Sequence, residues 1–238
     1  MKVRFYKFFR IAHKWAGLVL VLQLFFWIAG GVVMSAIPLE MVHGKHLAKQ
    51  PDTTVWQNRG SYYSLDEVLN NISFPATNIE FISIAQRPVY VIKGKSNAMY
   101  LDAHTGKAVT PLQQEQIEML AKNYYLQAHP VKSIRMLTEP PQEASRVTGT
   151  SWQVIFDDWL DTTLYLHPRT GKLEHVRSDL WRLFDFVWML HIMDYDEREN
   201  FNNPLLISFA IAALLFVLTG VVLLIKSFKP KSRQRRFA

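Results

Sequence analysis

The 238-residue chain contains no cysteine. This absence excludes disulfide bonds, thiolate-held iron–sulfur clusters, covalently attached c-type haem and a cysteine nucleophile. Any metal or cofactor ligand must therefore come from carboxylates or from the eight histidines. The sequence also lacks a glycine-rich phosphate or dinucleotide loop, an H-E-x-x-H zinc motif and a nucleophile elbow. We therefore do not expect the chain to bind NAD(P)H itself.

Acidic residues are missing from both ends of the chain, where much of the positive charge behind the net +7 is concentrated. One basic cluster adjoins the first apolar run and another follows the last one: Lys2, Arg4, Lys7, Arg10 and Lys14, then Lys226, Lys229, Lys231, Arg233, Arg235 and Arg236. Because both clusters adjoin apolar runs, we assign this charge to a membrane surface and expect no nucleic-acid partner.

Two long apolar runs, residues 15–37 and 205–225, contain no ionisable side chain. At a rise of about 1.5 Å per residue, a helix of either length crosses a hydrocarbon core of roughly 30 Å. A cleaved signal peptide is the competing interpretation of the first run. Because that run exceeds the apolar region of about 7–15 residues found in signal peptides, we expect it to be retained.

The two basic clusters flank the outer ends of the two apolar runs. By the positive-inside rule, both termini are expected in the cytoplasm and residues 40–203 on the opposite side of the membrane. In a bacterium that side is the periplasm. The sequence therefore predicts an inner-membrane protein, with membrane lipids surrounding its two spans.

The region between the spans contains a weak internal repeat. Residues 100–107 (YLDAHTGK) are echoed by residues 165–172 (YLHPRTGK). A helix is expected before each copy, at about 64–72 and 113–125. Strands are expected around the two Thr-Gly turns, at 89–92, 99–101, 152–156 and 163–166. These patterns predict a small α+β sandwich made of two helix-hairpin units.

The predicted fold class is a membrane protein with two transmembrane helices plus an interfacial helix, flanking a periplasmic α+β domain. Residues 1–39 form the basic N-terminus and the first transmembrane helix, and residues 40–110 and 111–177 form the two helix-hairpin units. Residues 178–203 form the interfacial aromatic helix with an acidic loop, and residues 204–238 the second transmembrane helix with a basic cytoplasmic tail.

A helix followed by strands and a Tyr-Leu-Asp-x-x-Thr-Gly-Lys hairpin resembles the PepSY module. Three further motifs resemble the PepSY-associated transmembrane family: His13-Lys14-Trp15-x-Gly17, Leu190-His191 and Thr219-Gly220. That family includes iron-regulated membrane proteins and periplasmic ferric-siderophore reductases that carry b-type haem. The resemblance covers nearly the whole chain and implies haem b as the cofactor. The longer relatives have four or more spans, whereas this chain has two.

His13 and His191 are the candidate haem and metal ligands. His13 lies where the first span meets the cytoplasmic face, and Gly17 leaves a hollow beside it in which a flat macrocycle would fit. The alternative assigns His13 to the basic interfacial collar. His191 falls on an apolar helical stripe, and Trp188 on the same helix is a candidate for packing against the cofactor rim.

The alternative for His191 is an interfacial helix that holds this histidine at the water boundary. In that case Arg182 and Asp185 form a solvated pair. His43 and His46 form an H-x-x-H pair whose spacing suits one helical turn. This pair is a candidate transition-metal site or a partner for His191, and the alternative is that both residues are merely solvated.

The other four histidines, His104, His129, His167 and His175, are expected at the surface or in turns. We assign no chemistry to the acidic clusters at 157–161 and 194–199, because charged loop tips are ordinarily hydrated.

Two functions remain open from the sequence. The first is a haem-b membrane electron-transfer protein, a ferric-reductase-like oxidoreductase subunit that relays electrons from a cytoplasmic flavoprotein or a quinol to a periplasmic ferric chelate or siderophore. The second is a membrane-anchored PepSY binding or regulatory module, with a protease or an envelope complex as partner and no cofactor. For the first function, a homodimer or a larger membrane complex would complete the haem site. Met34 or Met193 could replace a histidine as the second haem ligand at the site nearer the periplasm.

Overall fold

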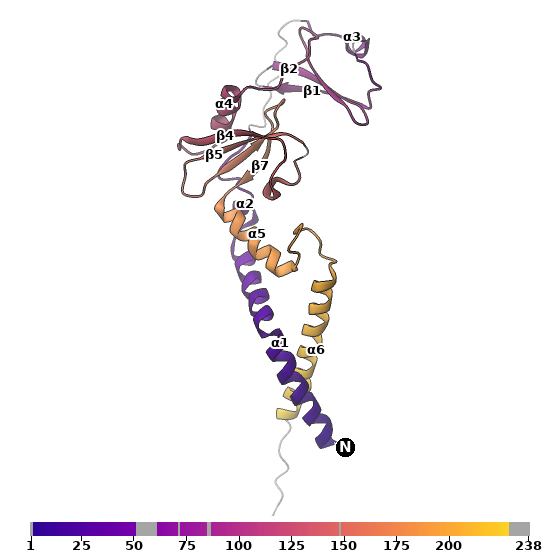
Figure 1. Cartoon of the computed structure of the whole chain (residues 1–238), viewed down its shortest axis with the longest axis vertical. Coiled ribbons are helices and arrows are strands. Elements are labelled where there is room, and N and C mark those ends of the chain that lie inside the picture. The colour runs from indigo at the N-terminus through magenta and orange to yellow at the C-terminus, as the bar shows by residue number, and fades with distance from the viewer. Residues whose placement is uncertain (1, 51–60, 71, 85–86, 148, 229–238) are drawn as a thin grey trace, which may run out of the picture. The chain divides into compact units, whose positions relative to one another are not determined.

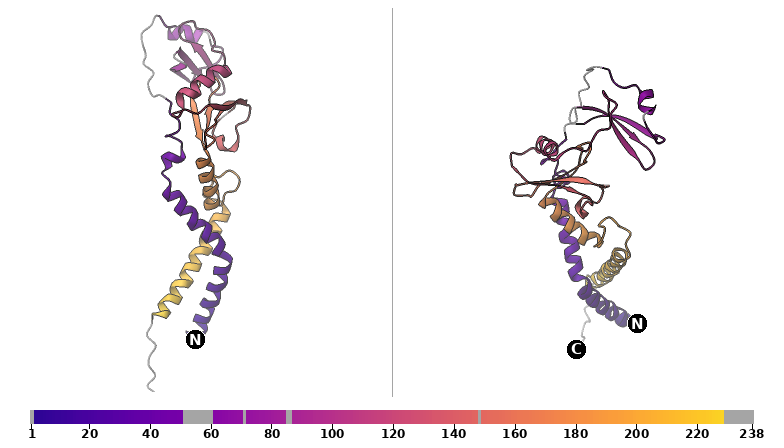
Figure 2. Two further views of the ribbon diagram at one scale, coloured as in Figure 1. Left: turned by 90° about the vertical axis from the view of Figure 1, so that its left-hand side faces the viewer. Right: turned by 45° about the horizontal axis from the view of Figure 1, so that its top comes forward.

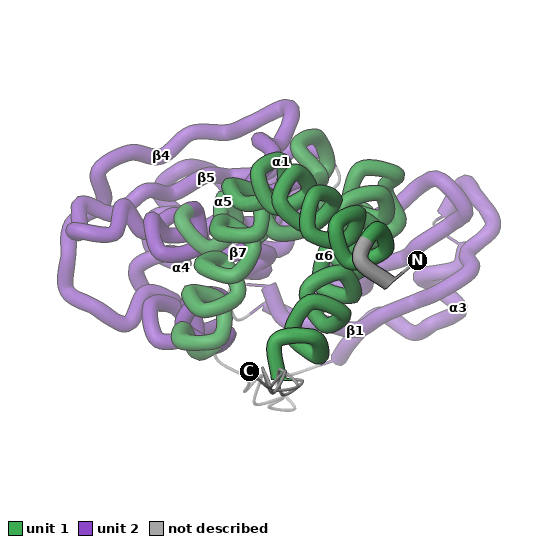
Figure 3. Tube along the Cα trace, turned by 90° about the horizontal axis from the view of Figure 1, so that it is seen from below, with its two compact units in different colours: residues 1–38, 183–238 green, residues 39–182 purple. Residues whose placement is uncertain are grey.

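The computed structural model describes residues 2–50, 61–70, 72–84, 87–147 and 149–228 (Figure 1). The chain divides into two compact units (Figure 3). The helical unit comprises residues 1–38 and 183–238, and the sheet unit comprises residues 39–182.

Three helices build the helical unit: α1 (Lys2–Ala36), the larger part of α5 (Asp179–Ile192) and α6 (Pro204–Ser227). Among the described residues, two helical segments are long and apolar enough to cross a membrane, Arg4–Ala36 and Pro204–Ser227. Only 11% and 6% of the residues in their most apolar windows are buried, so most of these apolar side chains are at least partly exposed. The predicted runs are thus helical, and α1 begins earlier than the apolar run because neither Gly nor Pro interrupts the basic residues before it.

Helices α1 and α6 pack antiparallel and cross each other (Figure 2). Near one end of the pair, Nζ of Lys226 lies 4.5 Å from the centre of the Tyr6 ring. Further along, Trp27 meets Phe209 edge to face, with ring centres 6.3 Å apart. The basic ends of the two helices therefore lie together. The remaining basic residues of the C-terminal cluster, at 229–236, lie outside the described residues.

The predicted acidic loop between α5 and α6 is held by its own hydrogen bonds. Asn203 caps α6, since its side-chain oxygen accepts the N–H of Leu206 at 2.8 Å and Pro204 occupies the first helical turn. The Asp194 carboxylate accepts the backbone N–H of Asn200 at 2.9 Å. This carboxylate therefore organises the loop.

The predicted solvated pair of Arg182 and Asp185 is wrong. Asp185 forms its ion pair with Arg198 of the loop, and the side chains of Asp185 and Arg198 are 17% and 27% exposed. Arg182 bonds instead to residues of the sheet unit. The pairing differs because Asp185 meets Arg198 of the loop, whereas Arg182 turns to Glu143 and to Asp179 one helical turn earlier.

The first half of the sheet unit contains two short helices and an antiparallel sheet of order β1-β2-β3: α2 (Leu39–Val42), α3 (Leu65–Asn70), β1 (Asn78–Ile84), β2 (Arg87–Lys93) and β3 (Ala98–Asp102). Helix α3 packs on one face of this sheet, where Val68 meets Ile92 and Leu101. The predicted helix and the two predicted strands are confirmed, and β1 adds an edge strand.

The second half repeats this arrangement with a longer helix and four antiparallel strands of order β4-β5-β6-β7: α4 (Gln114–Tyr124), β4 (Val131–Leu137), the 3₁₀ helix η1 (Gln142–Ala144), β5 (Ser151–Phe156), β6 (Thr163–Leu166) and β7 (Leu173–Arg177). Helix α4 and strands β5 and β6 match the predicted ranges closely. Strands β4 and β7 extend the predicted hairpin on both sides.

One hydrophobic core joins the two halves. It gathers side chains from the first sheet, from α4 and from the second sheet, among them Ile84, Val89 and Val91, then Ile117 and Ala121, then Val154, Phe156, Leu164 and Leu166. Nearly all of these side chains are less than 5% exposed. The two repeat units are therefore parts of one folded body rather than independent domains.

The two copies of the sequence repeat form turns with matching backbone geometry. Gly106 and Gly171, the glycines of the two Thr-Gly pairs, have positive φ angles of 66° and 64°. This backbone conformation favours glycine. The N–H of Gly106 donates to the carbonyl of Asp102 at 2.8 Å, and the N–H of Gly171 donates to the carbonyl of His167 at 2.9 Å. The repeat seen in the sequence is therefore a repeat in structure.

Side chains play equivalent parts in the two turns although their chemistry differs. In the first turn an Asp102 carboxylate oxygen accepts the N–H of Thr105 at 2.9 Å. In the second turn Nδ1 of His167 accepts the N–H of Thr170 at 3.2 Å. An imidazole nitrogen accepts only when it carries no proton, so the folded turn requires a neutral His167. Burial, aided by nearby cationic side chains, lowers the pKa of His167.

One expectation about histidines in the sheet unit is wrong. His43 and His46 do not share a helical turn, because α2 ends at Val42 and Gly44 has a φ of 69°. His175, expected at the surface or in a turn, is partly exposed and lies in strand β7 opposite Tyr165. Burial lowers the pKa of His175 to about 4.

Candidate functional site

His13 of α1 packs against α6. Its imidazole stacks on the Phe216 ring, with centres 4.2 Å apart and planes 5° apart. Its Nδ1 lies 2.8 Å from Oγ1 of Thr219 and 3.2 Å from the carbonyl oxygen of Phe216. A Cβ atom added at Gly220 would come within 3.1 Å of Cε1 of His13. The missing side chain at Gly220 is what allows this imidazole to lie against α6.

The hydrogen bonds around Thr219 fix the tautomer of His13. The Thr219 hydroxyl donates its proton to the carbonyl of Phe216 at 2.6 Å. With that proton used, Oγ1 of Thr219 acts as an acceptor, and Nδ1 of His13 must donate to it. Nε2 of a neutral His13 is then unprotonated and carries the lone pair.

His191 of α5 is held against α1 in a similar way. Its imidazole stacks on the Trp27 indole, with centres 5.0 Å apart and planes 14° apart. Its Nδ1 lies 3.1 Å from the carbonyl oxygen of Trp27, which can only accept, so Nδ1 donates. Cβ atoms added at Gly30 and Gly31 would each lie 3.8 Å from the His191 ring. Nε2 of the neutral ring is again the unprotonated nitrogen.

The two histidines therefore share one donor arrangement. Metal-ligating histidines donate one ring N–H to a carbonyl or carboxylate, which orients the ring and raises the basicity of the other nitrogen. Within the described part of the chain, Nε2 of His13 and Nε2 of His191 have no hydrogen-bond partner. In each residue the Nδ1 bond thus holds an unprotonated Nε2 in one orientation. Their contact positions on α1, residues 13 and 27, are separated by about 21 Å of helix.

Two residues that the sequence connected with a cofactor have other contacts. A Cβ atom at Gly17 would lie 3.1 Å from the Phe216 ring, so this ring fills the predicted hollow. The Trp188 indole donates to the carbonyl of Arg198 at 3.1 Å and meets Phe201 edge to face. Trp188 therefore fastens the loop between α5 and α6.

His43 and His46 are exposed residues of a turn in the sheet unit. Among the described residues, no group of three or more histidine, cysteine, aspartate or glutamate side chains is close enough to hold a metal ion. Each of the four histidines proposed from the sequence as a metal ligand therefore supplies at most part of a coordination shell within this chain.

A polar network in the sheet unit is centred on Arg182, the residue at the end of the first turn of α5. Its Nε and Nη2 atoms donate to the two carboxylate oxygens of Glu143 at 2.8 and 3.1 Å. The remaining donors reach Asp179 at 2.9 Å, Thr163 at 3.2 Å and the carbonyl of Asp161 at 3.4 Å. These five bonds match the five N–H groups of a guanidinium, so none is left for a ligand.

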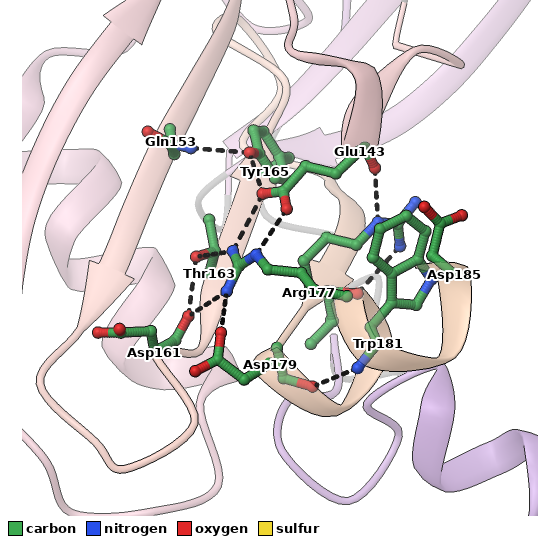
Figure 4. Close-up of polar contacts among 12 residues, drawn as sticks. Glu143, Gln153, Asp161, Thr163, Tyr165, Arg177, Asp179, Trp181 and Asp185 are labelled. Atoms are coloured by element: carbon green, nitrogen blue, oxygen red, sulfur yellow. Dashed lines mark hydrogen bonds and ion pairs between the residues drawn. The ribbon is translucent and has the colours of Figure 1, made fainter. Parts of the chain in front are cut away.

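The network continues through Glu143 into the second sheet (Figure 4). The Tyr165 hydroxyl donates to Glu143 at 2.6 Å, and the Gln153 amide donates to that hydroxyl at 2.7 Å. Burial alone would raise the pKa of Glu143, but the bonds from Arg182 and Tyr165 outweigh it and hold this pKa below its usual value. Sequence reasoning missed this network, which anchors the start of α5 to the sheet.

Comparison with protein-family models, with curated proteins and with solved structures gives no match to this chain.

Proposed function

We propose that this chain is a haem-b-binding protein of the bacterial inner membrane that passes electrons to a periplasmic acceptor such as a ferric chelate or siderophore. The observation that supports this most directly is the shared arrangement of His13 and His191. Each ring donates its Nδ1–H to an oxygen of a neighbouring helix and leaves Nε2 available as an axial ligand. The resemblance to the PepSY-associated transmembrane family supports the same assignment.

Each chain supplies one of the two histidine ligands that each proposed haem needs. Bis-histidine coordination needs two imidazoles at one level, and this chain offers His13 near one end of the helical unit and His191 about 21 Å away along α1. A second copy of the chain would supply the missing imidazoles and restore four spans. We therefore propose a homodimer, or a larger complex that completes the bundle in the same way.

Haem b supplies a one-electron redox couple when it is bound, and its potential depends on the axial ligands, burial and hydrogen bonding. The residues of this chain tune that environment. Thr219 and the carbonyl of Trp27 hold the two rings in one orientation, and a membrane around the apolar side chains of α1 and α6 would keep water away from them. The electron donor in this proposal is a cytoplasmic flavoprotein or a quinol, because the sequence has no dinucleotide loop.

The proposed orientation has both termini in the cytoplasm and the sheet unit in the periplasm. The contact of Lys226 with Tyr6 supports it, because the basic ends of both apolar helices then lie on one side of the membrane. In this arrangement the sheet unit is the part that meets the acceptor.

The optical spectrum of the purified, detergent-solubilised protein, expressed with an ample haem supply, tests the proposal. A Soret band with a sharp α-band after reduction is expected. A colourless but folded preparation would refute haem binding and favour the second candidate, a membrane-anchored binding or regulatory module of the PepSY type. One observation favours that module: the same histidine bonds clamp α1 to α5 and α6 without any cofactor.

A further inference from the structure

A groove in the sheet unit lies between α4 and the first sheet, with a volume of about 380 Å³. One wall is the turn that follows β3 and the irregular segment after it, and the other is the α4 face that carries Met119 and Leu120. The groove lies in the size range of sites for small organic ligands. It is separate from the histidines of the helical unit and from the Arg182 network.

The floor of this groove is apolar. Ile84, Val89 and Leu112 line it and are themselves only 3%, 1% and 6% exposed. Met119 on the α4 wall is 63% exposed, and its unbranched side chain adapts easily to a ligand surface. A bound apolar group would cover Met119 and contact the floor, which is the usual source of affinity in such sites.

The rim of the groove carries positive charge. Arg87 and Lys107 both line it, and in the described part of the chain neither forms an ion pair or a hydrogen bond through its side chain. The acidic residue that lines the groove is Asp102, whose Oδ1 already accepts the N–H groups of His104 and Thr105 and the hydroxyl of Thr105. Among the described residues neither cation pairs with this carboxylate, so both side chains can pair with an anionic ligand next to the apolar floor.

We propose that this groove binds a small monocarboxylate with an apolar body. Arg87 and Lys107 would pair with the carboxylate, and the hydrocarbon or aromatic body would lie on Ile84, Val89 and Leu112 beneath Met119. A cationic rim over an apolar floor selects this combination. A neutral ligand of the same shape cannot form the charge-assisted bonds, and a dianion without an apolar body makes no apolar contact with the floor. This inference does not depend on haem or on the orientation in the membrane.

The test uses the full chain in lipid nanodiscs and ligand-observed ¹⁹F NMR. The probes are 4-(4-fluorophenyl)butyrate and its uncharged isostere 4-(4-fluorophenyl)butan-1-ol, and empty nanodiscs give the background from partitioning into lipid. We expect the carboxylate to bind at least about tenfold more tightly than the alcohol, since one charge-assisted bond is enough for that ratio. Equal binding of the two probes would overturn the proposal.

Variants locate the site. The double variant Arg87→Gln and Lys107→Gln is expected to remove the preference for the carboxylate, and Met119→Glu is expected to weaken both probes. The matched control is Lys95→Gln with Lys122→Gln, which removes two exposed charges outside the groove. An unchanged preference in the Arg87 and Lys107 variant, or an equal loss in the control, would contradict the assignment. Thermal unfolding of each variant checks that the sheet unit remains folded.

Discussion

Trp27 and His191 exchange two hydrogen bonds, one in each direction. The indole N–H of Trp27 donates to the backbone carbonyl of His191 at 3.1 Å, and Nδ1 of His191 donates to the backbone carbonyl of Trp27 at 3.1 Å. Their rings also stack. This reciprocal contact fixes both the position and the tautomer of His191, which is the condition for a pre-oriented ligand.

The first prediction concerns haem content. His191→Ala is expected to lose more haem than His104→Ala, because His191 is the proposed axial ligand whereas His104 lies in an exposed turn. The measurement is the haem-to-protein ratio and the spin state in the optical spectrum. Identical spectra for the two variants would assign a purely structural part to His191.

A second prediction concerns assembly. Each chain supplies one histidine at the level of His13, so a six-coordinate haem there needs a second chain. We expect a detergent-corrected mass of a dimer, with His13→Ala losing one of two haems. The check combines light scattering with haem quantification. A monomer that keeps low-spin haem when His13 is replaced would rule out the symmetric site.

The third prediction concerns topology. The chain has no cysteine, so single cysteines can be introduced without background. In intact cells, a membrane-impermeant thiol reagent is expected to label Ser96→Cys, which lies in the exposed turn between β2 and β3, and to leave Ser232→Cys unlabelled. The opposite labelling pattern would reverse the proposed orientation.

The fourth prediction concerns acid. The lowered pKa values of His167 and His175 mean that the unfolded chain binds more protons than the folded one below about pH 6.5. The stability that these neutral histidines contribute is present above that pH and is lost as the pH falls, for His175 down to its folded pKa of about 4. The free energy of unfolding of the sheet unit should therefore fall from pH 7 to pH 4 in urea titrations followed by tryptophan fluorescence.

The two repeat turns provide a matched pair of control variants for this prediction, because Asp102 and His167 are equivalent acceptors. His167→Asp installs the acceptor of the sister turn and should reduce the slope between pH 7 and pH 5, whereas Asp102→His should add to it. Parallel profiles for the parent and both variants would show that the turn histidine does not titrate with folding.

The fifth prediction concerns the anchor of α5. The Arg182 and Glu143 side chains are 34% and 17% exposed, so their ion pair is intermediate between a surface ion pair and a buried one. Replacing Arg182 by Met should cost about 2 kcal/mol, because the Glu143 carboxylate and three other acceptors, on Asp161, Thr163 and Asp179, lose their donor. Lys122→Met, which breaks the exposed pair with Glu118, should cost under about 0.5 kcal/mol. A double-mutant cycle of Arg182→Met with Glu143→Gln measures the coupling, and a value near zero would contradict it.

The repeat could be predicted from the sequence because its signals are local. The Thr-Gly turns, their flanking strands and α4 follow from residues close together in the chain. Strand β4 escaped this reasoning because a register shift between Val131 and Ser133 breaks its alternation, and β7 because Glu174, His175 and Arg177 interrupt its apolar pattern.

The histidines of the candidate site were identified by their place near apolar runs, but their partners were not. His13 meets Phe216 and Thr219 across more than 200 residues of sequence. No spacing rule relates positions that far apart, and only the packing of α1 on α6 brings them together. For the same reason Phe216 occupies the space that Gly17 had suggested for a cofactor.

The place of Arg182 in the chain has a practical consequence for preparing the sheet unit in soluble form. A fragment truncated after β7 would retain Glu143, Tyr165 and Thr163 but would lack the guanidinium that joins them. The first turn of α5 therefore belongs to the minimal folded fragment, although the rest of that helix is an apolar segment that a water-soluble protein would have to omit.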